Sequence, residues 1–412
     1  MSNKKRMLVI SAVKPYPGNS GQQMRVRNKL LGFRKHFHIT FLTFDSDLPD
    51  AEGKLREYVD IPIVLPSLYM RSPVSRLINK YRAGAFARKH SLKESNFIIG
   101  ELELPPRRVA NAVDITQYDV VLFEYWHTHN LADLFASKRL PTVLDMHDIL
   151  WKSYERSVHD DDSLPVSEKQ QKILEYRTHE ESAWNKYDAI IAINRAEGDL
   201  LQNMLPADKK IFYAPMGIDM TNWAYQWEPA VPIRLGYYGG LGNPYNRRDA
   251  MFVYEEIMPN VWNQHPEADY WIVGSNPPDS IRSLQEKDKR VKVTGFVDKV
   301  QDVLKEMSII LCPFEGTFGF RSRIIEVMAL GIPIVATWDA VYGMDLNDGS
   351  GIYLRSTGSQ MADAVLQLLN DKELLQTQSR IARQTVESLY SFDRSYGRLS
   401  EELYTYLENV KA

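Results

Sequence analysis

Cysteine and long apolar runs are almost absent from this sequence. Its 412 residues include one cysteine, Cys312, which excludes an intrachain disulfide and a metal site built from cysteines. No stretch approaches the roughly 20 apolar residues that span a bilayer. The first apolar run, from Met7 to Val13, stops at Lys14 and is too short for a typical signal peptide. The net charge of -3 gives no reason to expect nucleic acid as a partner. We therefore expect a cytoplasmic protein that binds no nucleic acid.

Short apolar runs alternate with longer stretches of helical spacing. The runs are MLVISAV, HITFLTF, IPIVLP, DVVLFEY, TVLDM and AIIAIN in the first half and IRLGYYG, YWIVG, VKVTG, IILCP and IPIVAT in the second. Runs of this kind are typical of buried parallel strands. The helical stretches between them include 22–33, 180–187, 250–262 and 361–369. Strands that alternate with helices predict an α/β fold with doubly wound parallel sheets.

The length predicts two domains, because single hydrophobic cores rarely grow beyond about 250–300 residues. The Trp-rich stretch 220–232, MTNWAYQWEPAVP, interrupts the series of strands and marks the expected linker. We expect a first domain over residues 1–222, a second over 223–388, and a C-terminal helix over 389–412 that packs back on the first domain. Two such domains that face each other place the carboxyl ends of their strands, where ligands bind, across a shared cleft.

The loop PYPGNSGQQMRV joins the first strand to a helix and contains Gly18 and Gly21. These glycines allow a tight turn close to a ligand, and the free N–H groups at the helix start could face a diphosphate. The alternative is that the glycines only make a turn. Neither this loop nor the run GGLGN at 239–243 is the G-x-G-x-x-G dinucleotide fingerprint, so a nicotinamide-dependent oxidoreductase loses its main support.

The run CPFEGTFGFRSRIIEVMALGIPIVAT predicts a strand, a glycine-rich loop, a helix that begins near Arg321, and another strand. On that helix Arg323 and Glu326 lie three residues apart and share one face, away from the apolar face. A diphosphate at the helix start would meet unsatisfied N–H groups, the positive end of the helix dipole and two guanidinium groups. Glu326 could accept hydrogen bonds from a ribose diol. The alternative is an exposed ion pair between Arg323 and Glu326, worth about 0.2–0.5 kcal/mol.

This run resembles the donor-site signature of family 4 glycosyltransferases, in the group 1 subgroup that has G-x-R-x-(K/R)-x-x-E in place of E-x7-E. The similarity continues through YYGG at 237–240 and NRRDA at 246–250, and more weakly through DMHD at 145–148 and PMGID at 215–219. The resemblance implies the GT-B fold, with two Rossmann-like domains that face a central cleft. It also implies transfer of a sugar with retention of its anomeric configuration.

The resemblance also assigns roles by position. It implies that Glu326 binds the nucleotide ribose, Arg321 or Arg323 the diphosphate, and the backbone near Phe296 and Val297 the base. The loop PYPGNSG would cover the phosphates from the first domain. The expected substrate-binding residues are Gly18, Ser20, Gly21, Glu124, Arg248, Phe296, Val297, Gly319, Phe320, Arg321, Ser322 and Glu326.

Two departures from the family pattern bear on phosphate and sugar binding. Gly240 stands where the family commonly has arginine, so Arg247 or Arg248 must do that work. Phe318 occupies the place of the first glutamate of E-x7-E, a residue that commonly contacts the donor sugar. Glu315 is the candidate substitute. The pattern therefore predicts the reaction class and leaves the sugar open.

Polar residues at two other strand ends are candidates for acid–base chemistry. The run DVVLFEY contains Glu124 near its end and is followed by His127 and His129. The run TVLDM is followed by His147 and Asp148. Such groups could take the proton of an acceptor hydroxyl or bind a phosphate, although polar residues at strand ends also cap helices. His127 and His129 have no third ligand of matching character, so we expect no catalytic metal. The expected catalytic residues are Arg247, Arg323, His147 and Asp148.

The expected reaction moves a sugar from a nucleoside diphosphate sugar to the hydroxyl of a saccharide or lipid-linked acceptor, without a cofactor or metal. By family habit it belongs to polysaccharide or glycolipid biosynthesis. A sugar-nucleotide epimerase of the same fold and a non-catalytic nucleotide-sugar-binding protein are the alternatives.

One segment, from Leu68 to Lys93, is strongly basic. It carries seven arginine and lysine residues and no acidic residue, interleaved with Leu77, Ile78 and Tyr81. Such a segment could lie on an anionic membrane and bring the enzyme, as a peripheral protein of the inner face, to a lipid-linked acceptor. The alternative is a solvated loop and helix.

Overall fold

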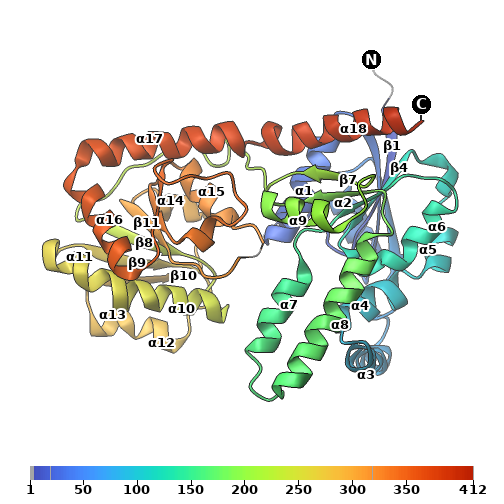
Figure 1. The fold of residues 1–412 in the computed structure, drawn as a ribbon, viewed down its shortest axis with the longest axis horizontal. Coiled ribbons are helices and arrows are strands. Elements are labelled where there is room, and N and C mark those ends of the chain that lie inside the picture. The colour runs from blue at the N-terminus through green and yellow to red at the C-terminus, as the bar shows by residue number, and fades with distance from the viewer. Residues whose placement is uncertain (1–3, 19, 318, 412) are drawn as a thin grey trace. The chain divides into compact units, whose positions relative to one another are not determined.

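The computed structural model describes residues 4–18, 20–317 and 319–411. They form two compact units: unit 1 comprises Met1–Pro215 with Ser395–Ala412, and unit 2 comprises Met216–Arg394. Each unit contains one parallel sheet with helices packed against it (Figure 1).

Unit 1 contains a seven-stranded sheet in the order β3-β2-β1-β4-β5-β6-β7. The strands are β1 (Lys5–Ile10), β2 (Phe37–Asp45), β3 (Ile61–Pro66), β4 (Val120–Glu124), β5 (Thr142–Asp145), β6 (Ala189–Ala192) and β7 (Lys210–Tyr213). Alternate residues of β4 serve two apolar cores, because successive side chains of a strand point to opposite faces. Val121 and Phe123 lie in one core and Val120 and Leu122 in the other. The sheet is therefore doubly wound.

The helices of unit 1 cover both cores. They are α1 (Gly21–Phe33), α2 (Leu48–Leu55), α3 (Pro73–His90), α4 (Glu94–Asn96), α5 (Pro106–Ala112), α6 (Ala132–Ala136), α7 (Leu150–His159), α8 (Val166–Trp184), α9 (Arg195–Met204) and α18 (Arg398–Lys411). Helix α18 buries Leu399, Leu403 and Leu407, four residues apart, in the core that also holds Val26 and Leu30 of α1. The C-terminal helix thus belongs to unit 1.

Unit 2 contains a six-stranded sheet in the order β10-β9-β8-β11-β12-β13. The strands are β8 (Arg234–Tyr238), β9 (Asp269–Val273), β10 (Val291–Gly295), β11 (Ile309–Cys312), β12 (Ile334–Ala336) and β13 (Ile352–Leu354). The helices are α10 (Pro244–Phe252), α11 (Met258–Gln264), α12 (Asp279–Arg282), α13 (Leu284–Lys287), α14 (Val300–Leu304), α15 (Ser322–Ala329), α16 (Gly358–Asn370) and α17 (Lys372–Leu389). Strand order reverses between β8 and β11 here and between β1 and β4 in unit 1. Ligands of such sheets bind beyond the carboxyl ends of the strands at these reversals.

The predicted fold class is confirmed. Each of the eleven apolar runs contains a strand, and β7 and β13 are additional strands of four and three residues, too short to show a pattern. The helix expected over 180–187 has other bounds: α8 begins at Val166 and ends at Trp184. Its polar sequence buries few side chains, so apolar spacing does not reveal it. No helix in the described part of the chain is long and apolar enough to cross a bilayer.

The Trp-rich stretch 220–232, expected as a linker, packs within unit 2. Four of its backbone N–H groups donate to carbonyls of that unit. The indole N–H of Trp227 donates to the carbonyl of Met307 at 3.0 Å. The boundary between the units falls earlier, before Met216. The aromatic residues of the stretch thus serve packing in unit 2.

The close approach of α17 to the start of β13 can be tested at Gly351. Its φ is +85°, and a Cβ there would lie 2.3 Å from the Cα of Ala382 in α17. Gly349 has the same φ of +85° with open space around it. We expect Gly351→Ala to lower the free energy of unfolding by about 2–4 kcal/mol and Gly349→Ala by about 1 kcal/mol. Urea unfolding measures both, and equal losses would show that overlap with α17 is unimportant.

Candidate functional site

The start of α15 lies where strand order reverses in unit 2. Gly319 has a φ of +65°, a left-handed conformation that glycine adopts without strain, and the helix begins at Ser322 as the sequence predicts. Ile324, Ile325 and Met328 are buried in the core. That leaves Ser322, Arg323 and Glu326 on the half-buried face of the helix. Phe318, expected from the sequence to bear on the choice of sugar, lies outside the described residues.

Arg323 connects α15 to the end of β8. Its Nη1 donates to the carbonyl of Tyr238 at 2.7 Å, and its Nη2 donates to Oδ1 of Asn246 at 3.1 Å. The guanidinium carbon lies 4.5 Å from the centroid of the Phe314 ring. A Cβ on Gly239 would come within 1.8 Å of Nη1, so this path for the side chain requires glycine there. Arg323 is therefore a positive charge held in one place at the switch point.

Glu326 has partners other than Arg323. The hydroxyl of Tyr238 donates to its Oε2 at 3.4 Å, and the Ser322 side chain also hydrogen-bonds to it. Burial raises the pKa of Glu326, against the opposing effects of Ser322 and Arg323. The exposed ion pair with Arg323 that sequence allows is not formed, because Arg323 points to Tyr238 and Asn246. The carboxylate of Glu326 thus lies one helical turn after the N-terminus of α15, which is the positive end of the helix dipole.

Arg321 and Phe320 hold the loop before α15. Nη2 of Arg321 donates to the carbonyl of Gly316 at 2.9 Å, and its guanidinium carbon lies 5.4 Å from the Phe314 ring centroid. The ring of Phe320 packs 5.8 Å from that of Tyr390, near the end of α17. The structure therefore uses Arg321 to shape this loop.

Helix α10 brings three charged residues to the same region. Arg247 is half-buried, and Arg248 is exposed and forms an ion pair with Glu315 at 2.7 Å. Asp249 is 5% exposed, and burial raises its pKa to about 6, although Arg323 and Arg248 act in the opposite direction. Sequence reasoning did not single out Asp249. The sequence feature that could have identified it is the position of this aspartate next to Ala250, on the buried face of α10.

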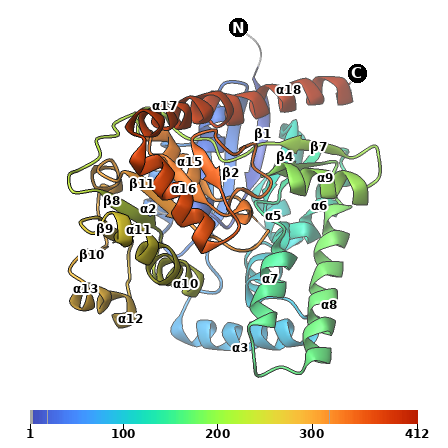
Figure 2. The same cartoon turned by 60° about the vertical axis from the view of Figure 1, so that its left-hand side comes forward.

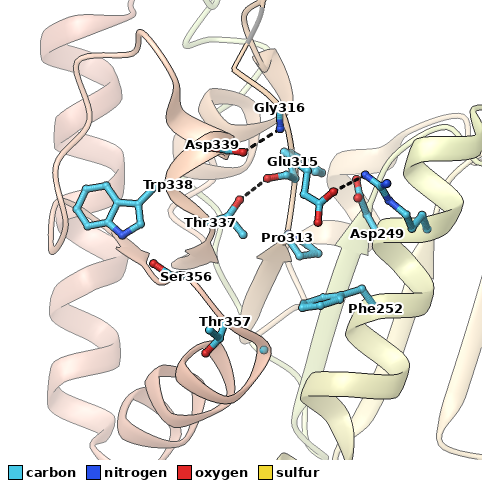
Figure 3. A pocket seen from close by; sticks show the side chains of 13 residues that line it. Asp249, Phe252, Pro313, Glu315, Gly316, Thr337, Trp338, Asp339, Ser356 and Thr357 are labelled. Carbon is cyan, nitrogen blue, oxygen red and sulfur yellow. Dashed lines mark hydrogen bonds and ion pairs between the residues drawn. The ribbon is translucent and has the colours of Figure 1, made fainter. Parts of the chain in front are cut away.

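A cavity of about 780 Å³ opens beside this cluster (Figure 3). Phe252 and Trp338 lie on opposite sides of it, and Asp249 and Glu315 are on the side of α10 (Figure 3). The carboxylate of Asp339 accepts the N–H of Gly316 at 2.9 Å. The recess therefore combines aromatic walls with carboxylates, next to the arginines.

Phe296 and Val297 follow β10, the edge strand, and β9 separates that strand from β8. The Phe296 side chain is 75% exposed. The residues lie at the carboxyl end of their strand, as predicted, and in the described part of the chain no side-chain hydrogen bond or ring contact joins them to α15. Their exposure leaves room for a planar ligand.

The first loop of unit 1 caps α1. Gly18 has a φ of +86°, and Ser20 is the N-cap residue, whose hydroxyl accepts the N–H of Gln23 at 3.4 Å. Gly21 is the first residue of the helix, with nothing within 4 Å of where a Cβ would be. Beside the loop is a cavity of about 680 Å³, lined among others by Ser20 and Tyr16. Burial raises the pKa of Tyr16 to about 12.

The ends of β4 and β5 carry a buried charge network. Nε2 of His147 lies 2.6 Å from Oε2 of Glu124. Nζ of Lys29 lies 2.8 Å from Glu124 and also contacts Asp145. Nη2 of Arg25 donates to Asp145 at 2.9 Å. Burial alone would raise the pKa of Asp145, but the two cations hold it well below its usual range.

Two residues of this network have strained backbones. Tyr125 and His147 have φ values of 66° and 59°, although neither is glycine. Their rings stack with centroids 4.1 Å apart. Strain of this kind persists only where the surroundings impose it, and it clusters at functional sites. Asp148, the next residue, is half-buried, and its backbone N–H donates to the carbonyl of Met146 at 2.7 Å.

His127 and His129 form no ion pair with the charged groups of this network among the described residues, although the ring of His127 lies 5.5 Å from that of Tyr125. The centroids of both imidazole rings lie 5.6 Å from that of the Trp126 ring. Nδ1 of His129 lies 3.2 Å from the carbonyl oxygen of Trp126. Burial lowers the pKa of His127 to about 4. Their surroundings indicate a packing role.

Glu124, Asp145 and His147 bring three potential metal ligands within 4.8 Å of one another. The ammonium group of Lys29 already contacts both carboxylates, and the Arg25 guanidinium contacts Asp145. A divalent cation there would be placed against two fixed positive charges. This donor set therefore does not fit a metal ion.

Comparisons with known proteins bear on both units. A family model described as "Glycosyl transferases group 1" matches residues 232–371, within unit 2. No curated protein matches the sequence. Among solved structures, TarM of S. aureus has a TM-score of 0.64 at 12% identity and covers 99% of each chain. Sucrose-phosphate synthase from Thermosynechococcus elongatus has a TM-score of 0.63 at 17% identity and covers 98% of this chain and 100% of its own.

HepE of Anabaena, solved in complex with UDP, has a TM-score of 0.62 at 13% identity and covers 97% of this chain and 100% of its own. At these identities the solved structures are similar in fold. The chain has the GT-B fold, with two Rossmann-like domains, and residues 232–371 of unit 2 match the group 1 glycosyl transferase model.

The charge network of unit 1 can be tested by removing its central carboxylate. Asp145→Asn leaves Lys29 and Arg25 without that counter-charge, and we expect a loss of about 3–5 kcal/mol in the free energy of unfolding. Asp133→Asn removes a carboxylate that is 73% exposed and paired with Lys186, and it should cost below about 1 kcal/mol. Urea unfolding gives both values, and a small loss in Asp145→Asn would contradict the network's role.

The raised pKa of Asp249 predicts a pH dependence. A carboxyl with a folded-state pKa of about 6 and an ordinary pKa of 3.8 contributes stability below pH 4 that is lost as the pH rises through 6. Asp249→Asn does not titrate, so wild type should lose up to about 3 kcal/mol relative to this variant between pH 4 and pH 7. Urea unfolding across that range measures it, and Asp298→Asn controls for removal of a surface charge. A constant difference would contradict the burial of a charged Asp249.

Proposed function

We propose that the protein is a retaining glycosyltransferase that moves a sugar from a nucleoside diphosphate sugar to a hydroxyl acceptor. The observation that carries this proposal is the start of α15, where the helix N-terminus, Arg323 and Glu326 lie together at the switch point of unit 2. A helix start with a fixed guanidinium suits a diphosphate. A carboxylate one turn further on suits the two hydroxyls of a ribose.

The donor would bind along the carboxyl edge of the unit 2 sheet. Glu326 accepts from the ribose, Arg321 and Arg323 with Arg247 or Arg248 from α10 bind the diphosphate, and the segment after β10 contacts the base. Solved structures of similar fold support a uridine nucleotide as the first to test, since HepE was solved with UDP and with UDP-glucose. TarM was solved with UDP and a GlcNAc-bearing glycerol.

The chemistry would depend on the leaving diphosphate. Negative charge builds on it as its bond to the anomeric carbon breaks, while the acceptor hydroxyl attacks the same face of the sugar. Fixed arginines and the helix dipole stabilise that charge without reorganising, which is commonly the largest catalytic contribution. These groups do the work that a divalent cation would otherwise do.

Unit 1 would serve the acceptor through His147 and Asp148. Burial lowers the pKa of His147, so the ring is neutral near pH 7. Its Nε2 lies 2.6 Å from the Glu124 carboxylate and therefore carries the proton of the neutral ring, which leaves Nδ1 as the acceptor. A neutral imidazole of this kind can receive a proton or hydrogen-bond to a hydroxyl. We place the reaction in the cytoplasm, in polysaccharide or glycolipid assembly.

The donor site is tested by Glu326→Ala. Loss of a hydrogen bond to a charged carboxylate should weaken UDP binding about 10- to 100-fold, because such a bond contributes about 1.5–3 kcal/mol. Isothermal titration calorimetry measures the dissociation constant. Glu255→Ala, which removes an exposed carboxylate from the same unit, should bind UDP as wild type does. Unchanged affinity in Glu326→Ala would remove the ribose assignment.

Incubation with UDP-sugars then separates the reaction classes. Release of UDP that depends on an added saccharide or lipid-linked acceptor supports transfer. Conversion of the sugar without an acceptor would indicate an epimerase, and binding without turnover would indicate a non-catalytic protein. Either of these two outcomes overturns the proposed reaction.

A further inference from the structure

Helix α3 exposes an apolar stripe. The exposed fractions of Val74, Leu77, Ile78 and Tyr81 are 68%, 72%, 54% and 75%. These residues follow the spacing i, i+3, i+4, i+7, so they lie on one face of the helix. Contiguous exposed apolar patches of this kind mark interaction surfaces.

The opposite face of α3 attaches it to unit 1. Asn79 and Ala83 are buried, and the ring of Phe86 lies 5.5 Å from that of Phe97. Helix α3 lies at the periphery of unit 1 in both views (Figure 2). The stripe therefore faces away from the core while the helix itself is held in place.

Basic residues surround the stripe. By the helical repeat, Lys80 and Arg82 lie on its two sides, and Arg76 lies beside Lys80. The Arg82 guanidinium packs 5.3 Å from the Phe97 ring. Among the described residues, no carboxylate lies within ion-pair distance of Arg71, Arg76 or Lys80. Positive charge is thus available next to exposed apolar side chains.

The basic charge around the stripe indicates which kind of partner binds there. A second copy of α3 would bring two basic surfaces together, which like-charge repulsion disfavours. An anionic bilayer fits, because aliphatic and aromatic side chains can enter the interface while lysine and arginine meet the head groups. The turn between α7 and α8, residues 160–162, is a run of three exposed aspartates, so the contact would be made by α3 and not by that turn.

We propose that α3 is an interfacial membrane anchor that inserts Val74, Leu77, Ile78 and Tyr81 below the head groups of an anionic bilayer. The sequence shows basic charge over this segment, and the structure adds the apolar face that enters the lipid. Delivery of the enzyme to a lipid-linked acceptor rests on the proposed function, whereas the membrane contact itself does not.

Co-sedimentation with vesicles tests the anchor. The full-length protein should sediment with vesicles of phosphatidylglycerol and phosphatidylcholine at low salt, and much less with phosphatidylcholine alone. The double variants Leu77→Ser/Tyr81→Ser and Arg76→Glu/Lys80→Glu should each weaken partitioning about tenfold or more. These side chains are exposed, so the fold should be kept, which circular dichroism and UDP binding check.

Matched controls come from the same unit. Val166→Ser/Leu174→Ser removes apolar side chains of α8 that are 71% and 64% exposed. Both this variant and one with exposed Lys35 and Lys138 changed to Glu should partition as the parent does. Absence of parent binding, sedimentation without vesicles, or equal loss in the controls overturns the proposal. Failure to bind UDP would contradict the proposed function and leave the vesicle result standing.

Discussion

The carboxylate of Asp145 is the charge on which the architecture of unit 1 depends. It is completely buried at the end of β5, where Arg25 and Lys29 of α1 both reach it. Arg25 also donates to the carbonyl of Ala214, after β7, at 2.9 Å. Helix α1 is thereby fixed over the carboxyl ends of the sheet. A buried charge is stable only when paired, so the three groups position one another.

In unit 2 a single arginine connects the elements around the switch point. Arg323 reaches from α15 to the carbonyl of Tyr238, and its partner Asn246 lies on α10. The two helices follow the two central strands of the reversal, so a single side chain fixes their starts relative to each other. In unit 1 the cations are neutralised by carboxylates. In unit 2 the buried carboxyl of Asp249 has its pKa raised to about 6 by burial, and the surroundings of Arg323 therefore retain more positive character.

Much of the fold follows from local sequence, because strands and their order of appearance depend on patterns of a few residues. The start of α15 is predicted correctly since its glycines, its apolar face and its terminal Gly331 all lie within one run. The partners of the charged residues are not predictable in this way. Arg25 and Asp145 are 120 positions apart, and Arg323 and Tyr238 are 85 apart. Only the packed sheet brings them together.

The same limit explains why the sequence indicates Glu124 and His147 separately and not as a pair. Each follows a strand end, which sequence shows, but adjacency of β4 and β5 sets the 2.6 Å contact between them. Their pairing changes the chemistry. A lone histidine at a strand end could take either tautomer, whereas one bonded to a carboxylate and stacked on Tyr125 has a defined acceptor nitrogen. That orientation requires strained backbone conformations at Tyr125 and His147, and the neighbouring buried ion pairs stabilise these conformations.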